Sequence, residues 1–201
     1  MTQASLEFVY EEIKNGNLPF ITYGKDDIIK FPDQQINVMC GSFNPVHHGH
    51  IKIAEHVFYD TPGGGCPVWL ELSLTNCDKG VITYEELRDR LYDIAQLRYK
   101  ECIAGVIITN QANFIDKLEV LQRKVTFVCG LDTLVRLVQS KYYQNPDDYL
   151  YSMDELNNNC DFLVAPRDGV VRTLDCDRVN YTLLDYVDSG VSSTKIREGN
   201  L

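Results

Sequence analysis

Segments with strand character and segments with helical periodicity alternate along this chain of 201 residues. Residues 67–72 and 125–129 are short runs rich in branched and aromatic side chains, which predicts buried strands. In residues 83–97 and 131–138 the apolar side chains recur every three or four positions, and that spacing predicts helices. Such alternation is typical of a mostly parallel sheet with helices on both faces. The sequence therefore predicts an α/β fold, an α/β/α sandwich in which ligands bind at the carboxyl ends of the strands.

The N-terminal segment departs from this alternation. Apolar residues between Leu6 and Ile13 have helical spacing, and a run of turn residues, Asn-Gly-Asn, follows at residues 15–17. We therefore expect residues 1–33 to be a helical extension packed on a domain of residues 34–201.

A second departure lies between residues 142 and 160, which are acidic and rich in amides. We expect a surface insertion there, with a short helix opened by Ser152 and Glu155. Further strands are expected at residues 35–40, 104–109, 161–165 and 181–187, and further helices at residues 114–121 and 191–198.

All four histidines lie within a short stretch, and three of them form the segment His47-His48-Gly49-His50, called the histidine tetrad below. The tetrad follows a predicted strand and the turn Cys-Gly-Ser-Phe-Asn-Pro, and helical spacing of apolar residues begins directly after it. At a helix N-terminus the free N–H groups and the helix dipole attract anions, and Gly41 and Gly49 let the backbone approach one closely. His47 and His50 are three residues apart, so both imidazoles face the same side.

The main alternative for these histidines is a metal site, because imidazole is a common zinc ligand. His56 points about 180° away from His47 round the predicted helix, so the two cannot bind one metal ion. The chain also has no HExxH or CxxC motif. The pattern therefore favours an anion site, and we expect no metal ion held by protein ligands alone.

Charge and cysteine content limit the kinds of partner. The net charge of −10 and the pI of about 4.8 oppose an extended nucleic-acid or anionic membrane surface, which requires a basic stripe. We expect neither nucleic acid nor membrane as a partner, and a phosphate ligand would need local cations and a divalent metal ion. The seven cysteines form no CxxC pair and several lie in strand-like runs, which predicts a reduced protein of the cytoplasm or nucleus.

A second candidate anion site lies near the C-terminus, in residues 191–197 (Val-Ser-Ser-Thr-Lys-Ile-Arg). This segment follows a predicted strand and opens a helix, and Ser192, Ser193 and Thr194 supply hydroxyl groups and cap oxygens at its start. Arg197 is four residues after Ser193 on the same face, and its guanidinium suits phosphate. Alone, the segment is equally typical of an ordinary capped helix. Together with the tetrad it predicts two turns that hold opposite parts of a polyphosphate.

Both motifs resemble signatures of the nucleotidylyltransferase superfamily. Gly-Ser-Phe-Asn-Pro followed by the histidine tetrad is similar to its HxGH signature, and residues 191–197 are similar to its ISSTxxR signature. They occur in the family's order near opposite ends of residues 35–198. Within the superfamily, the sequence is most similar to nicotinamide or nicotinate mononucleotide adenylyltransferases. The resemblance implies a Rossmann-like form of the α/β/α sandwich.

The resemblance also implies roles for individual residues. His50 would contact the transferring α-phosphate, His47 the triphosphate, and Arg197 the β- and γ-phosphates. The implied nucleotide-binding residues are Gly41, Ser42, Phe43, Gly49, Gly130, Asp132, Ser192, Ser193 and Thr194, with Ser42 and Phe43 acting through backbone groups and Gly130 and Asp132 in a turn that meets the ribose.

For the acceptor, Asn76 and Lys79 are similar to a family loop whose lysine reaches phosphates. Trp69, Phe114 and Tyr143 are candidates to stack on a base or nicotinamide ring, and each suits an ordinary core position at least as well.

The reaction implied by the resemblance is adenylyl transfer from ATP to nicotinamide mononucleotide, giving NAD and pyrophosphate, with Mg²⁺ bridging the phosphates. The alternatives are cytidylyl or adenylyl transfer to another small phosphorylated acceptor, such as an alcohol phosphate or phosphopantetheine, or nucleotide binding by a regulator without turnover. The presence of His47, His50 and Arg197 argues against the regulator, because these side chains serve chemistry more than folding. The sequence decides neither the base nor the acceptor nor the oligomeric state.

Overall fold

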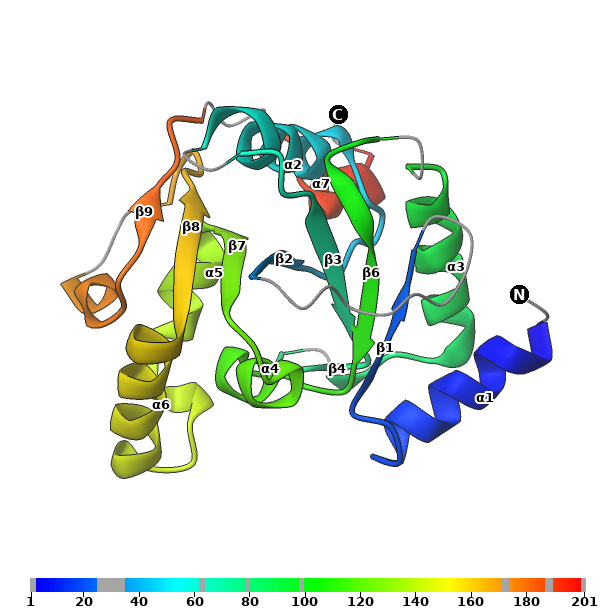
Figure 1. Cartoon of the computed structure of the whole chain (residues 1–201), viewed down its shortest axis with the longest axis horizontal. Coiled ribbons are helices and arrows are strands. Elements are labelled where there is room, and N and C mark those ends of the chain that lie inside the picture. The colour runs from blue at the N-terminus through cyan, green and yellow to red at the C-terminus, as the bar shows by residue number, and fades with distance from the viewer. Residues whose placement is uncertain are drawn as a thin grey trace.

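A seven-stranded sheet forms the centre of the computed structural model, which describes residues 3–24, 35–61, 64–78, 80–97, 100–170, 174–186 and 190–199 (Figure 1). The strands, in spatial order, are β1 (Phe20–Tyr23), β6 (Ile103–Thr109), β3 (Val68–Ser73), β2 (Ile36–Cys40), β7 (Val125–Gly130), β8 (Cys160–Ala165) and β9 (Thr182–Leu183). Neighbouring strands are parallel except β1 and β6, which confirms the predicted mostly parallel sheet. Separately, β4 (Thr75–Asn76) pairs with β5 (Gly80–Val81).

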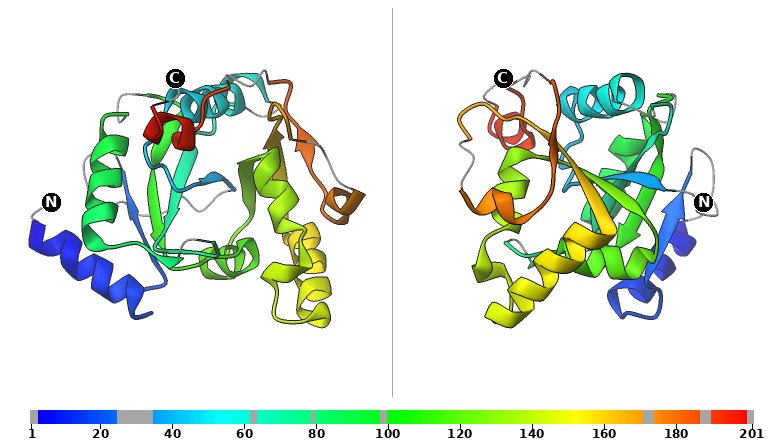
Figure 2. Two further views of the ribbon diagram at one scale, coloured as in Figure 1. Left: turned by 180° about the vertical axis from the view of Figure 1, so that it is seen from behind. Right: turned by 60° about the vertical axis from the view of Figure 1, so that its left-hand side comes forward.

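Helices cover both faces of the sheet (Figure 1 and Figure 2), because successive side chains of a strand point to opposite sides. Leu70 and Leu72 of β3 belong to an apolar cluster with residues of α1 (Gln3–Lys14), α2 (His48–Asp60) and α3 (Tyr84–Ala95). Trp69 of the same strand belongs to a second cluster with residues of α4 (Phe114–Leu121), α5 (Leu131–Leu137) and α6 (Pro146–Asn159). The predicted α/β/α sandwich is therefore confirmed. No helix in the described ranges is long and apolar enough to cross a membrane.

The chain changes direction across the sheet between β2 and β7. From β2 it continues to β3 and β6 on one side, and it returns to β7 on the other side. β2 leads into α2, which packs on one face, while β7 leads into α5, which packs on the other. Because the two segments leave toward opposite faces, a crevice opens at the carboxyl ends of these neighbouring strands.

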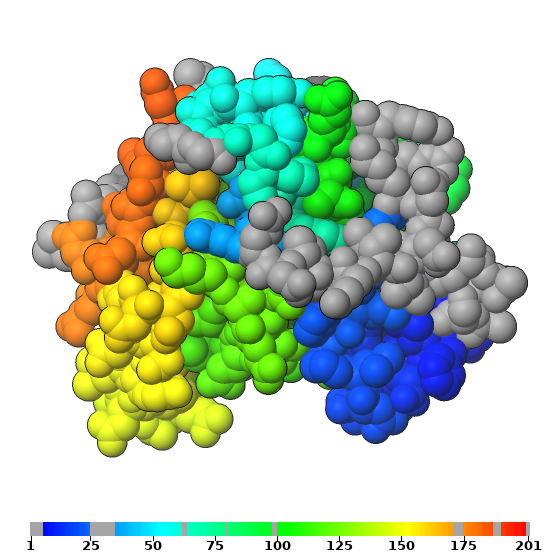
Figure 3. Space-filling model, in the orientation of Figure 1, coloured from blue at the N-terminus to red at the C-terminus, as the bar shows by residue number. Residues whose placement is uncertain are grey.

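The N-terminal segment contributes a strand as well as the expected helix. α1 buries Tyr10 and Ile13, and the Tyr10 hydroxyl donates to the Ile82 carbonyl at 2.9 Å. β1 then pairs with β6, so the N-terminal segment forms one edge of the sheet (Figure 1). Its atoms lie at the lower right of the space-filling view (Figure 3, blue). This strand was not predicted, because four residues following Pro19 become a strand only through their pairing with β6. Residues 25–34, which include the expected boundary, lie outside the described residues.

The predicted surface insertion around Ser152 is wrong. α6 begins at Pro146, and Asn145 caps it by accepting the Asp148 N–H at 2.9 Å. Proline suits the first helical position, where no N–H donor is required. Ser152 is fully buried in the middle of α6, and Leu156 packs in the second apolar cluster. The cap signal of Asn145-Pro146 was therefore the relevant one.

Most other predicted elements are present with small shifts at their ends. The exception is the strand expected at residues 181–187, of which β9 covers only Thr182–Leu183 among the described residues. Its pairing with β8 is limited to two positions.

Replacing Asn145 by alanine removes the side-chain cap of α6 and should lower the free energy of unfolding by about 1 kcal/mol. Asn158→Ala, on the exposed surface of the same helix, is the matched control. It should be neutral or slightly stabilising, because alanine is the better helix former. Urea denaturation measures both changes, and equal stability of the two variants would contradict the cap.

Candidate active site

A cavity of about 530 Å³ opens at the carboxyl ends of the parallel strands. Its wall includes the turn after β2, the start of α2, the ends of β3 and β7, β4, the segments after β6 and β8, and residues of α3, α4, α5 and α7 (Ser193–Arg197). It therefore lies where the crossover between β2 and β7 places a ligand crevice. Its volume is in the range of sites for small organic ligands.

Most residues singled out from the sequence reach this cavity. The wall contains His47, His50, Arg197, Gly41, Ser42, Gly49, Gly130, Asp132, Asn76, Phe114 and Tyr143. The described wall does not contain Phe43, Trp69, Ser192, Ser193 or Thr194. Lys79 lies outside the described residues. The cavity thus brings the histidine tetrad and the C-terminal arginine together.

The turn after β2 is built around Phe43. Its φ is +43°, in the left-handed region that residues other than glycine rarely adopt, and its side chain is 1% exposed. A Cβ at Gly41 would lie 2.9 Å from Cζ of Phe43, which is why glycine is required there. The Phe43 ring also meets His50 edge-on, with ring centroids 5.1 Å apart. Phe43 therefore supports the tetrad from the core, and its backbone contact with a nucleotide stays a prediction.

His47 and His50 are stacked at the start of α2. Their ring centroids are 3.8 Å apart, and the two rings are inclined by 28°. The His47 N–H donates to Nδ1 of His50 at 3.2 Å, so the hydrogen of a neutral His50 ring is assigned to Nε2. Burial lowers the pKa of His50 to about 3, together with the nearby charges of His47 and Arg167. At pH 7, His50 is therefore a neutral N–H donor suited to a phosphate oxygen and a poor general base.

The C-terminal turn is hydrogen-bonded to the turn after β2. Ser193 Oγ donates to the Pro45 carbonyl at 2.9 Å, and Nη1 of Arg197 donates to the Asn44 carbonyl. Nη2 of Arg197 donates to Thr194 Oγ1 at 3.2 Å. These bonds hold the Arg197 guanidinium at the cavity wall.

The three hydroxyl residues before Arg197 have structural partners. Ser192 caps α7 by accepting the Lys195 N–H at 3.2 Å. Ser193 links the two turns and Thr194 accepts from Arg197. Direct phosphate contacts of Ser192, Ser193 and Thr194 stay predictions.

The cavity wall also contains cations that were not among the predicted site residues, Arg90, Lys117, Arg136 and Arg167. Arg90 is only 9% exposed, and among the described residues its Nε has no hydrogen-bond partner. Its Nη2 lies 3.5 Å from Oε1 of Glu86. Burial lowers the pKa of the Arg90 guanidinium, and the charge of Arg197 lowers it further. A buried guanidinium without a full set of acceptors favours an anionic ligand.

A sequence signal for Arg90 existed. Leu87 and Ile94 are the buried apolar residues of α3, and Arg90 lies between them on the same face. A charged residue on the apolar stripe of a helix is rare unless it is paired. The sequence pattern therefore marks Arg90 as a candidate for a buried ion pair or an anion contact.

The aromatic candidates divide into two groups. Phe114 and Tyr143 line the cavity, where Tyr143 is fixed by a hydrogen bond from its hydroxyl to the Leu137 carbonyl at 2.8 Å. Trp69 is 4% exposed and packs in the second apolar cluster, so the stacking role considered for it is wrong. Trp69 lies near the start of β3, away from the carboxyl end of the strand where the cavity opens, and it packs there against residues of α4.

A helix N-terminus with paired histidines and an arginine in one cavity, at the carboxyl ends of a parallel sheet, is an arrangement suited to a nucleotide phosphate. A family model described as cytidylyltransferase-like matches residues 38–199. The chain belongs to this family.

One curated relative is a Schizosaccharomyces pombe protein provisionally named nicotinamide mononucleotide adenylyltransferase. It is 29% identical over 123 residues, which are 58% of this chain and 47% of the relative. The chain thus matches about half the length of that relative.

Two solved structures share the fold. Both are of the Plasmodium falciparum nicotinic acid mononucleotide adenylyltransferase, one complexed with NaAD and the other with APC. Each has a TM-score of 0.59 and covers 82% of this chain and 83% of its own, at 13% and 12% identity.

The lowered pKa of His50 predicts a pH-dependent contribution to stability. The unfolded state binds a proton below about pH 6.5, whereas the folded state resists it until about pH 3. The contribution is therefore fully present above pH 6.5 and is lost as the pH falls toward 3. As the pH falls, the free energy of unfolding of the wild type should decrease relative to that of His50→Asn by at most about 1.4 kcal/mol per pH unit.

Urea denaturation at pH 7, 6 and 5 tests this. His48→Asn, which removes an exposed imidazole from the same tetrad, is the control. A His50→Asn difference that stays constant over this range would contradict a neutral, partly buried His50.

Proposed function

We propose that this chain transfers the adenylyl group of ATP to a pyridine mononucleotide, with nicotinamide mononucleotide as acceptor, and releases pyrophosphate. The observation that carries the proposal is the hydrogen-bonded junction of two turns at one cavity. The junction places His50 and the Arg197 guanidinium on the same wall. Membership of the cytidylyltransferase-like family and the name of the yeast relative support this class of reaction.

The acceptor phosphate needs no base in this reaction. Its second pKa of about 6 leaves it mostly dianionic at pH 7. One of its oxygens bonds to the α-phosphorus of ATP, while the bond from that phosphorus to the bridging oxygen breaks and pyrophosphate leaves with the electron pair. Catalysis then depends on positioning and on stabilising charge. We assign Nε2–H of His50 to an oxygen of the α-phosphate and His47 to the triphosphate.

The leaving pyrophosphate is assigned to two arginines. Arg197 would hold the β- and γ-phosphates, as the sequence motif implies. Arg90 faces the same space from α3 and has donor capacity that the described chain leaves unused. A phosphate group between them would relieve the repulsion of two neighbouring guanidinium groups.

Mg²⁺ is best treated as part of the ATP substrate. Among the described residues, no group of three or more His, Cys, Asp and Glu side chains is placed to hold a metal ion. Mg²⁺ in nucleotide sites takes most of its ligands from phosphates and water, with one or two carboxylates. Asp132 at the cavity wall is a carboxylate of the required kind.

A second candidate is cytidylyl transfer to another small phosphorylated acceptor, which the description of the family model favours. One experiment separates the candidates. The protein is incubated with Mg²⁺, either ATP or CTP, and a panel containing the two pyridine mononucleotides, glycerol phosphate and phosphopantetheine. Pyrophosphate release and the product mass identify the reaction. Nucleotide binding without turnover of any acceptor would favour a regulator.

His50→Ala should lower kcat by at least about 10²-fold, the scale for losing one preorganised donor. His48→Ala, the exposed neighbour in the tetrad, should retain most of the activity. Pyrophosphate release measures both rates, and circular dichroism checks that both variants fold. A His50→Ala protein with full activity would refute the assignment.

Arg90→Met should raise the KM for ATP by about tenfold or more, because a charge-assisted phosphate contact is lost. It should leave thermal stability unchanged or higher, because the variant buries no incompletely paired cation. Arg88→Met removes an exposed arginine of the same helix that contacts Asp89, and should leave the KM unchanged. A stable Arg90→Met protein with the wild-type KM would remove Arg90 from the site.

A further inference from the structure

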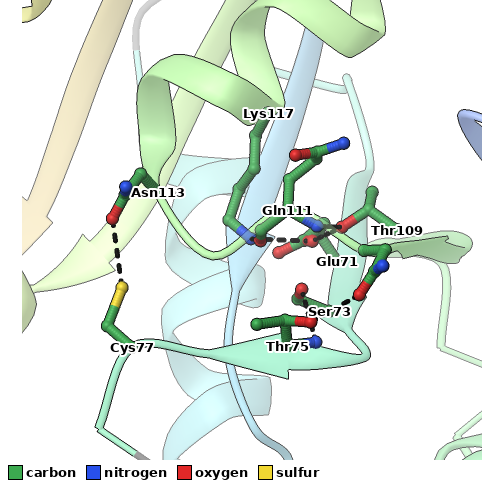
Figure 4. Close-up of polar contacts among 9 residues, drawn as sticks. Glu71, Ser73, Thr75, Cys77, Thr109, Gln111, Asn113 and Lys117 are labelled. Atoms are coloured by element: carbon green, nitrogen blue, oxygen red, sulfur yellow. Dashed lines mark hydrogen bonds and ion pairs between the residues drawn. The ribbon is translucent and has the colours of Figure 1, made fainter. Parts of the chain in front are cut away.

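Glu71 of β3 and Lys117 of α4 form a buried ion pair in the wall of the active-site cavity (Figure 4). Nζ of Lys117 lies 3.0 Å from Oε1 of Glu71, and the side chains are 5% and 1% exposed. The Thr109 hydroxyl donates to the same oxygen at 2.6 Å, and Nζ of Lys117 also donates to the Gln111 carbonyl. No local sequence pattern predicts this pair, because its members lie 46 positions apart on different elements.

Stability does not explain why an ion pair occupies this position. Removing two charges from water is expensive, and well-packed apolar residues are often as good or better at the same place. The surroundings are apolar, because Trp69 on the same strand face and Leu118 and Leu121 on the same helix pack in the second cluster. Binding of a polar ligand in the cavity would explain why charged side chains occupy this position, whereas packing does not.

The pair retains hydrogen-bonding capacity. An ammonium group has three N–H donors, of which Lys117 uses two in the contacts with Glu71 and Gln111. A carboxylate has about four acceptor positions, and Lys117 and Thr109 take two of them. The Cys40 thiol contacts the same carboxylate, and burial with that negative charge raises its pKa, so it stays a donor. Among the described residues, one donor of Lys117 and at least one acceptor position of Glu71 therefore remain unused, and the pair carries no net charge.

A carboxamide complements such a pair. Its oxygen accepts and its NH₂ group donates, and it carries no charge. A carboxylate at the same place offers acceptors only, and one of its oxygens would face Glu71 at a like-charge contact.

Phe114 places a ring next to this pair. It begins α4 three residues before Lys117, so both side chains project from one face of the helix, and both line the cavity. A pyridine ring against Phe114 would direct its substituent toward Lys117 and Glu71.

We propose that Glu71 and Lys117 recognise the carboxamide of the acceptor ring and so select nicotinamide mononucleotide over nicotinic acid mononucleotide. This inference rests on the proposed adenylyl transfer and adds the residues that determine its acceptor. The comparisons leave that choice open, since the yeast relative is named for the amide and the solved structures for the acid.

The test measures kcat/KM for both acceptors in wild type and in Glu71→Gln. Glutamine keeps the shape and can still accept from Lys117 and Thr109, but it leaves the lysine charge uncompensated. The wild type should prefer the amide, and the ratio of amide to acid should fall by about tenfold or more in Glu71→Gln, which favours the carboxylate. Glu86→Gln removes a carboxylate from the same cavity beside Arg90 and should leave the ratio unchanged.

A second variant keeps the test decisive if Glu71→Gln does not fold. Glu71→Met combined with Lys117→Met removes both buried charges and should fold. Its ratio of kcat/KM for the amide to kcat/KM for the acid should fall close to one. The KM for nicotinamide mononucleotide should increase, and the KM for ATP should stay unchanged. Acid preference in the wild type, or a ratio unaffected by these variants, would overturn the inference. Turnover of neither acceptor by the wild type would instead refute the proposed function itself.

Discussion

Ser193 and Arg197 of α7 donate hydrogen bonds to the carbonyl groups of Pro45 and Asn44 in the turn after β2. These bonds join two segments that are far apart in the sequence, and they do so at the ligand crevice. The sheet topology alone opens a crevice after β2 and β7. The hydrogen bonds hold the Arg197 guanidinium in the wall that also contains the stacked histidines. Without them the short α7, which buries no residue of its own, would have little to hold it in place. The cavity therefore depends on polar contacts between distant turns as much as on the apolar core.

Charge is distributed unevenly in an acidic protein. The chain has a net charge of −10, yet the cavity wall gathers arginines from α3, α7 and the segment after β8. On β3 and α4, by contrast, the one lysine is neutralised by Glu71. In the proposed reaction, the polyphosphate would be attracted to the first region and would gain nothing from the second. This difference would orient a substrate that has a charged end and a neutral ring.

Local patterns were sufficient for most elements, because strand runs, helical spacing and caps depend on neighbouring residues. They also singled out His47, His50 and Arg197, which the structure brings to one cavity. They failed where structure comes from distant partners. β1 is a strand because it pairs with β6, and Glu71 is tolerated in the core because Lys117 reaches it from α4. The predicted start of α6 was wrong for a different reason. Asn145-Pro146 is a local helix-start signal, but the prediction used the weaker cap signal at Ser152.

The neutral state of His50 constrains how the site can work. A group with a pKa of about 3 neither takes a proton from the acceptor nor carries a charge to attract ATP. In the proposed reaction, attraction would come from the arginines, while His50 would supply a directed N–H that costs little reorganisation when the phosphorus changes geometry. Bound phosphate would favour the charged imidazole, so the donor would strengthen as negative charge accumulates on the transferring group. The stacking on His47 and the support from Phe43 keep that donor in place before the substrate arrives.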